Sequence, residues 1–115
     1  MTNPIIKNIE PREIIHFKDE VVYQKGQVVS KTIVKSSKAN ISLFAFDKDE
    51  GLSAHTSSGD ALVTILDGEA LITIDDKEYV LKENESILMP ANIKHALHAI
   101  KPFKMFLVII FEDKK

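Results

Sequence analysis

Two histidines, each beside a turn, are the residues of this chain best suited to chemistry. His55 lies in the stretch GLSAHTS of residues 51–57, and His95 ends the stretch MPANIKH of residues 89–95. Imidazole titrates near neutral pH, so it can transfer protons, form hydrogen bonds or bind a transition metal. No Ser-His-Asp set and no carboxylate pair accompanies them, and Ser57 is weak evidence for a nucleophile. The residues therefore indicate a pocket or a metal site and assign no catalytic group.

Short β-rich runs surround these histidines from residue 27 to the end of the chain. Turn signals rich in Gly, Asp, Asn and Ser separate them. The expected strands are residues 28–34, 41–46, 61–66, 70–74, 78–81, 86–89, 95–99 and 103–111. The Asp67-Gly68 pair is the strongest hairpin signal, because a type I′ turn needs positive φ at both central residues. Many short, evenly spaced strands indicate a barrel or a sandwich.

The segment before the strands, residues 1–26, contains the one helix that we expect. Pro11 is favoured at a first helical position and Glu13 suits the positive end of the helix dipole, so residues 11–15 predict a short helix. No repeat, low-complexity tract or linker divides the sequence. We expect a single domain over residues 1–115, with the barrel in residues 27–111.

The first signature resembles the first sequence motif of the cupin superfamily, small antiparallel barrels whose two motifs place side chains in one central pocket. That motif reads Gly, five residues, His, one residue, His, three or four residues, Glu, six residues, Gly. With Gly51 and Gly68 as its two glycines, His55 matches the first histidine after a shortened spacer. Ser57 replaces the second histidine, and Ala61 stands where the glutamate would be.

The second signature resembles the second cupin motif, which reads Gly, five residues, Pro, one residue, Gly, two residues, His, three residues, Asn. Pro90 and His95 match it, whereas Ala99 replaces the final asparagine. Asn84 and Asn92 occupy the glycine positions, and Asn tolerates positive φ better than other residues with a side chain. The resemblance implies an all-β, cupin-like double-stranded β-helix, a jelly-roll barrel, in which two of four usual metal ligands remain.

Strand periodicity predicts which side chains face the barrel interior. If the strand of residues 61–66 turns Ala61 inward, Val63 and Ile65 follow it, and the residues between them face outward. By the same alternation, His95 and Leu97 share one face of their strand while His98 points the other way. His98 is then a surface or interface residue, and His16 lies outside both motifs.

A pocket for a small organic molecule is the function that we expect from these residues. His55, Ser57 and His95 would supply its hydrogen bonds, as in a mostly apolar cavity with a few convergent polar groups. Its apolar walls would come from Phe44, Phe46, Met89, Leu97 and Phe106. An enzymatic step in this pocket stays open.

A metal-dependent enzyme, dioxygenase-like or isomerase-like, is the alternative. The metal would be a divalent transition ion, Zn, Ni, Fe or Mn, held by His55 and His95. Catalytic metals usually have about three protein ligands. The third would have to be water, a bound ligand, or Asp60 turned inward by a bulge. A third hypothesis is a structural or regulatory dimer whose pocket is vestigial. The loss of two of the motif ligands supports it.

Composition and charge disfavour two classes of partner, nucleic acids and membranes. The 115 residues carry a net charge of -2 with both signs interspersed, which disfavours nucleic acid as a partner. The longest apolar run, residues 105–111, is too short to cross a bilayer, and the N-terminus lacks the pattern of a signal peptide. Cysteine is absent, which is compatible with a reducing compartment. We expect a soluble, cytoplasmic protein with no membrane partner.

Two strands are apolar on both faces, which predicts that the outer side of the barrel is covered. Residues 61–66 and 105–111 lack the alternation typical of a strand with one wet face. A second copy of the chain would bury them in a homodimer, as the resemblance implies. The alternative is that Ile14, Ile15 and Phe17 fold back over the sheet of their own chain.

Overall fold

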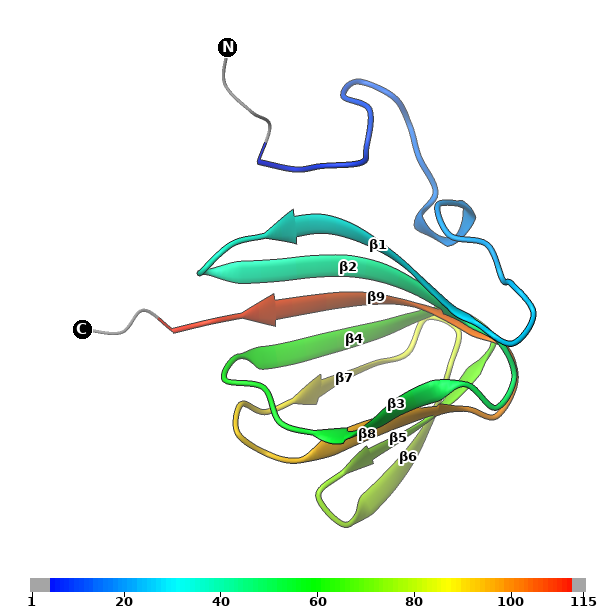
Figure 1. Cartoon of the computed structure of the whole chain (residues 1–115), viewed down its shortest axis with the longest axis vertical. Coiled ribbons are helices and arrows are strands. Elements are labelled where there is room, and N and C mark those ends of the chain that lie inside the picture. The colour runs from blue at the N-terminus through cyan, green and yellow to red at the C-terminus, as the bar shows by residue number, and fades with distance from the viewer. Residues whose placement is uncertain (1–4, 113–115) are drawn as a thin grey trace.

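The computed structural model describes residues 5–112, which form two antiparallel sheets and one short 3-10 helix (Figure 1). The helix is η1 (Phe17–Asp19). The strands are β1 (Val28–Lys35), β2 (Ala39–Phe46), β3 (Gly51–His55), β4 (Asp60–Asp67), β5 (Glu69–Ile74), β6 (Lys77–Lys82), β7 (Ser86–Met89), β8 (His95–Ala99) and β9 (Phe103–Ile110). In this part of the chain no helix is long and apolar enough to cross a membrane.

The two sheets face each other and enclose the main core. Sheet A has five strands in the order β1-β2-β9-β4-β7, and sheet B has four in the order β3-β8-β5-β6. Figure 1 shows sheet A above sheet B, with β3 in front. The alternating apolar side chains on the two inner faces pack together, as in other sandwiches and barrels. Fully buried members of this core include Phe46, Val63, Ile65, Ile72, Phe103 and Met105. The expected all-β jelly-roll fold is confirmed.

One strand and one turn were predicted incorrectly. The sequence did not indicate β3, since it is short and its last three residues are exposed, so it lacks a buried apolar pattern. The Asp67-Gly68 pair does not close a hairpin, because β4 and β5 belong to different sheets. Only Gly68 of the two has positive φ, at 82°, and the chain crosses there from sheet A to sheet B. The two-residue hairpin is Asp75-Asp76, between β5 and β6.

The helix predicted at residues 11–15 is wrong. Arg12 adopts φ +67°, outside the helical region, so Pro11 and Arg12 form a turn instead. The helical turn in this segment is η1, and none of its residues is buried.

The N-terminal segment covers part of the outer face of sheet A. A second core forms there from Val21, Ile33, Val34, Leu43 and Ala45. Phe17 stacks on Phe106 with ring centroids 4.8 Å apart, and Ile9 and Tyr23 pack against the same core. Ile14 is 93% exposed, so it takes no part in this cover. The chain therefore supplies some of the cover for its own sheet, through Phe17 but not Ile14.

Candidate functional site

The two motif histidines lie opposite each other on neighbouring strands of sheet B. His55 ends β3 and His95 begins β8, and the two residues are paired in the ladder. Their ring centroids are 4.4 Å apart at an angle of 68°, an edge-to-face contact. Gly51 allows the close approach of these strands, since a Cβ there would lie 2.1 Å from the carbonyl oxygen of Leu97. The first motif glycine thus helps to bring the histidines together.

Backbone carbonyls orient both imidazole rings. His55 Nδ1 lies 2.8 Å from the carbonyl oxygen of Ser53, and His95 Nδ1 lies 3.2 Å from that of Ile93. A carbonyl only accepts, so each Nδ1 carries the proton in these bonds. Each Nε2 then presents its lone pair, as in histidines that accept a ligand proton or bind a metal.

The two histidines differ in their surroundings. His95 is buried, with 4% of its surface exposed, whereas His55 is exposed. Burial lowers the pKa of His95 from its usual value, and the charge of nearby His55 lowers it further, while the hydrogen bond to Ile93 opposes both effects. The pair therefore combines a neutral, buried imidazole with a solvent-facing one.

The loops of the two signatures are hydrogen-bonded to each other. Asn92 N donates to the carbonyl of Ser57 at 2.7 Å, and Ala91 N donates to Oδ1 of Asp60 at 2.8 Å. Asn84 and Asn92 have φ of 71° and 65°, which confirms that asparagine serves where the motif has glycine. The hydroxyl of Ser57 accepts from Gly59 N at 3.2 Å, so it stabilises its own loop.

The donor set does not fit a tightly held transition metal. Residues 5–112 contain no group of three or more His, Cys, Asp or Glu side chains placed to hold an ion. Two imidazoles stand together, but Asp60 does not join them, because β4 pairs with β9 in regular register there and its carboxylate is bonded to Ala91. Ala61 offers no ligand atom. Two protein ligands fall short of the three that catalytic sites usually have.

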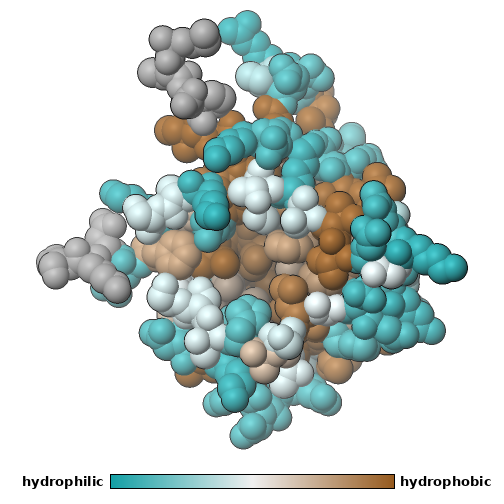
Figure 2. All heavy atoms as spheres, viewed as in Figure 1, coloured by the Kyte–Doolittle hydropathy of each residue, from teal (hydrophilic) through white to brown (hydrophobic). Residues whose placement is uncertain are grey.

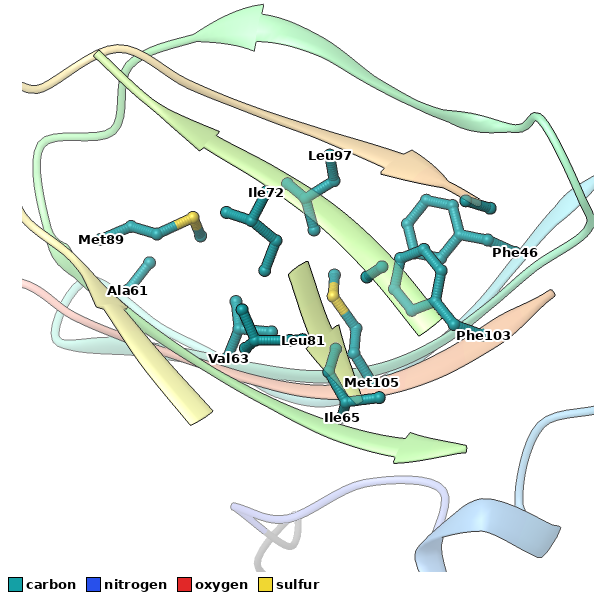
Figure 3. Packing of buried hydrophobic residues seen from close by; sticks show 12 residues of the cluster. Phe46, Ala61, Val63, Ile65, Ile72, Leu81, Met89, Leu97, Phe103 and Met105 are labelled. Atoms are coloured by element: carbon teal, nitrogen blue, oxygen red, sulfur yellow. The ribbon is translucent and has the colours of Figure 1, made fainter. Parts of the chain in front are cut away.

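The expected apolar walls divide into three groups. Phe46, Met89 and Leu97 are at most 4% exposed and fill the core between the sheets. In Figure 3, Met89 lies beside Ala61 at one end of this core, and Phe46 stacks on Phe103 at the other end. Phe44 is partly buried beside this core.

The prediction that Phe106 lines the apolar wall of the pocket is wrong. Phe106 alternates with the inward residues Met105 and Leu107 along β9 and so faces the outer side of sheet A, where it stacks on Phe17. A side chain on that face cannot line the barrel interior.

A cavity that the sequence analysis missed lies on the inner face of β1, β2 and β9. Its volume is about 240 Å³, and its lining is Thr32, Val34, Lys35, Asn40, Ser42, Phe44, Leu107 and Ile109. In Figure 2 apolar atoms are set back between polar ones near the centre of the face in view. Asn40 and Ser42 alternate with Ile41 and Leu43, and that period of two was the available signal that both face inward.

One cross-strand row connects this cavity with the histidines. Asn40 pairs with Ile109, Ile109 with Ala61, and Ala61 with Met89. Met89 ends β7, and the loop of residues 90–94 leads from it to His95. The ends of β3 and β9 and the start of β2 also lie on the same side of the molecule in Figure 1. The cavity and the histidine pair thus belong to one end of the barrel.

Known structures with the same architecture include proteins of unassigned activity. A conserved protein of unknown function from Streptococcus pyogenes is 38% identical, with a TM-score of 0.96, over 99% of this chain and all of its own. A cupin superfamily protein from Desulfitobacterium hafniense is 31% identical, with a TM-score of 0.89, over 93% of this chain and 98% of its own.

A third similar structure is longer. It is a cupin 2 conserved barrel domain protein from Leptotrichia buccalis, 40% identical with a TM-score of 0.79, and the match covers 81% of this chain but 45% of that one. No functionally curated protein matches the chain. The cupin domain model matches residues 42–111, which hold both histidine signatures. With that match and these structures, the chain belongs to the cupin family.

Proposed function

We propose that this cupin barrel binds a small organic molecule at its histidine end. The observation that carries the proposal is the paired imidazoles, each with Nδ1 bonded to a carbonyl and Nε2 left as an acceptor. A cavity at the same end of the barrel supports it, although neither histidine lines that cavity, because ligand sites combine apolar walls with a few polar groups. His55 and neutral His95 would accept hydrogen bonds from the ligand, and proton transfer by His55 is the chemistry open to an enzymatic step.

A thermal-shift screen with a His55 variant tests this proposal. Molecules that bind the folded state raise the unfolding temperature. His55→Ala removes an exposed side chain, so the variant should fold normally and lose the shift produced by a hit. His98→Ala is the matched control, since His98 is also exposed but lies on the other face of β8 beside Asp49. Equal shifts in wild type and His55→Ala would contradict a role for the pair.

Metal-dependent chemistry is the second candidate, and the orientation of the rings favours it. Metal-bound histidines usually donate their second N–H to a carbonyl or carboxylate, as both rings do here. Zn, Ni, Fe or Mn would be bound through the two Nε2 atoms. The protein would supply too few ligands to retain the ion without a ligand-derived donor. This candidate predicts that added metal binds weakly alone and more tightly with a chelating ligand.

We also propose that the chain forms a homodimer, with a cytoplasmic location. The outer face of sheet A exposes Leu62 (43%), Leu88 (53%) and Ile110 (55%), and Leu62 pairs with Leu88 on β7, the edge strand. Beside them Thr64 and Ser86 bond to each other at 2.7 Å, and a charged residue, Asp60, pairs with Ile110 at one end of the strip. An apolar strip of this kind can bury its surface against its own copy across a two-fold axis.

Light scattering after size exclusion tests the dimer. Wild type should give about twice the chain mass of 12.9 kDa. Leu88→Lys should give monomers, because it places charges in the strip. Val80→Lys is the control, since Val80 is similarly exposed, at 50%, but lies on β6 in sheet B. Monomeric wild type at micromolar concentration would contradict the proposal.

A further inference from the structure

We propose that Thr32, Asn40 and Ser42 form a polar subsite that binds an alcohol or primary amide group of the ligand. This inference rests on the proposed function and specifies the ligand more closely. The three side chains come from β1 and β2 and line one cavity. None of them belongs to either cupin motif of this sequence.

Asn40 carries the acceptor that a donor group of a ligand would satisfy. Its Oδ1 is buried and has no hydrogen-bond partner among the described residues. An unpartnered buried acceptor is unfavourable, and native structures contain few of them. The backbone of Asn40, near the start of β2, is held between Lys35 on β1 and Ile109 on β9. Rotation of the carboxamide about Cβ–Cγ can therefore present this oxygen to a donor in the cavity without moving the strand.

Two hydroxyl groups make the subsite suited to a group that both donates and accepts. Thr32 and Ser42 are directly paired across β1 and β2 and line the same cavity as Asn40. A hydroxyl can donate one hydrogen bond and accept two, and a carboxamide oxygen only accepts. Alcohols and primary amides satisfy both requirements, whereas ethers and tertiary amides offer no donor to Asn40.

The rest of the cavity limits the body of the ligand. Phe44, Leu107 and Ile109 form an apolar wall beside the polar groups, and among the described residues Lys35 is the one charged residue of the lining. The volume of about 240 Å³ lies below the range of about 300–1,000 Å³ usual for drug-sized ligands. The ligand class is therefore a small molecule with an apolar body and one hydroxyl or carboxamide end.

Nuclear magnetic resonance with two matched probes tests the subsite. Benzamide carries an amide donor, and N,N-dimethylbenzamide has the same ring and carbonyl without one. Benzamide should shift the side-chain amide signals of Asn40 and the backbone signals of Ser42 and Leu107. The dimethyl compound should bind about tenfold more weakly, the expected effect of leaving a buried acceptor unpaired.

Variants separate the contribution of each group. Asn40→Leu keeps the size of the side chain. It should weaken the binding of benzamide about tenfold and leave the binding of the dimethyl compound unchanged. Ser42→Ala is a second variant should Asn40→Leu fail to fold, and it should also weaken benzamide. Ser30→Ala is the control, since Ser30 lies on β1 but is exposed and does not line the cavity. Equal binding of the two probes to wild type would overturn the subsite.

The pattern of shifts also separates this inference from the proposed function. Shifts at His55 and His95 with Asn40 unaffected would leave the histidine site standing and overturn the subsite. Shifts at Asn40 with both histidines unaffected would support the subsite and contradict the histidine site. No shift at either place with millimolar benzamide would count against both.

Discussion

Replacement of Gly51 by alanine should destabilise the protein strongly and pull the histidines apart. The added Cβ would lie 2.1 Å from the backbone oxygen of Leu97, and such contacts below 3.0 Å essentially never occur. Because the clash is with backbone, no side-chain rotation can relieve it, and β3 must move away from β8 by about 1 Å. That movement weakens the adjoining hydrogen bond from Ala99 N to the carbonyl of Glu50, now 2.9 Å long.

The magnitude follows from two costs. Overpacking costs about 1–3 kcal/mol, and a lost backbone hydrogen bond costs about 0.5–1.5 kcal/mol. We therefore expect the free energy of unfolding to fall by about 1.5–4.5 kcal/mol. Urea titration followed by far-UV circular dichroism measures this difference. Any folded variant should also lose the contact between the rings, whose centroids are 4.4 Å apart in the wild type.

Gly26→Ala is the matched control for this prediction. Gly26 has φ of +70° and no atom within 4 Å of an added Cβ, so alanine there meets backbone strain without a clash. That strain costs about 1 kcal/mol. A Gly51→Ala variant as stable as wild type, or less affected than Gly26→Ala, would refute the close packing of β3 on β8.

Two further predictions concern the two faces of the fold. The pKa of His95 is lower in the folded state than in the unfolded chain, so folding favours the neutral ring. The contribution of this ring to the free energy of unfolding is present above the ordinary histidine pKa. It is lost as the pH falls through the lowered pKa. The urea midpoint should therefore drop on acidification, and by less in His95→Gln; identical pH profiles would contradict this. Phe106→Ala should lower the free energy of unfolding by about 2–4 kcal/mol, because the packing of the ring on Phe17 is lost. It should leave the affinity for a ligand bound inside the barrel unchanged. Weakened ligand binding in that variant would contradict its placement on the outer face.

The fold was predictable because its signals are local. Alternation in β4 correctly placed Ala61, Val63 and Ile65 inside, and alternation in β8 placed His95 inside and His98 outside. The turn asparagines were recognisable because few residues with a side chain accept positive φ. β3 escaped prediction because a short, exposed strand has no pattern of burial. The turn at Gly68 was misread because the same local signal serves a hairpin and a crossing between sheets.

The site was predictable only in part, because it depends on which strands become neighbours. Motif spacing identified the histidine pair. It could not indicate that Thr32, Asn40 and Ser42 share a cavity, since the β1–β2 pairing creates it. Phe106 was assigned to the wrong face because β9 is apolar on both sides, so composition alone does not distinguish them. The cover from the N-terminal segment likewise depends on contacts distant in sequence.

Elemental analysis of protein purified without an affinity tag tests the central claim most directly, namely that the histidine end binds a small molecule without a resident metal. His55 and His95 are two ligands where about three are usual, so we expect well under one transition-metal ion per chain. His55→Ala and His95→Ala should then leave the metal content unchanged. One ion per chain in the wild type, lost in both variants, would contradict the account and establish the pair as a metal centre.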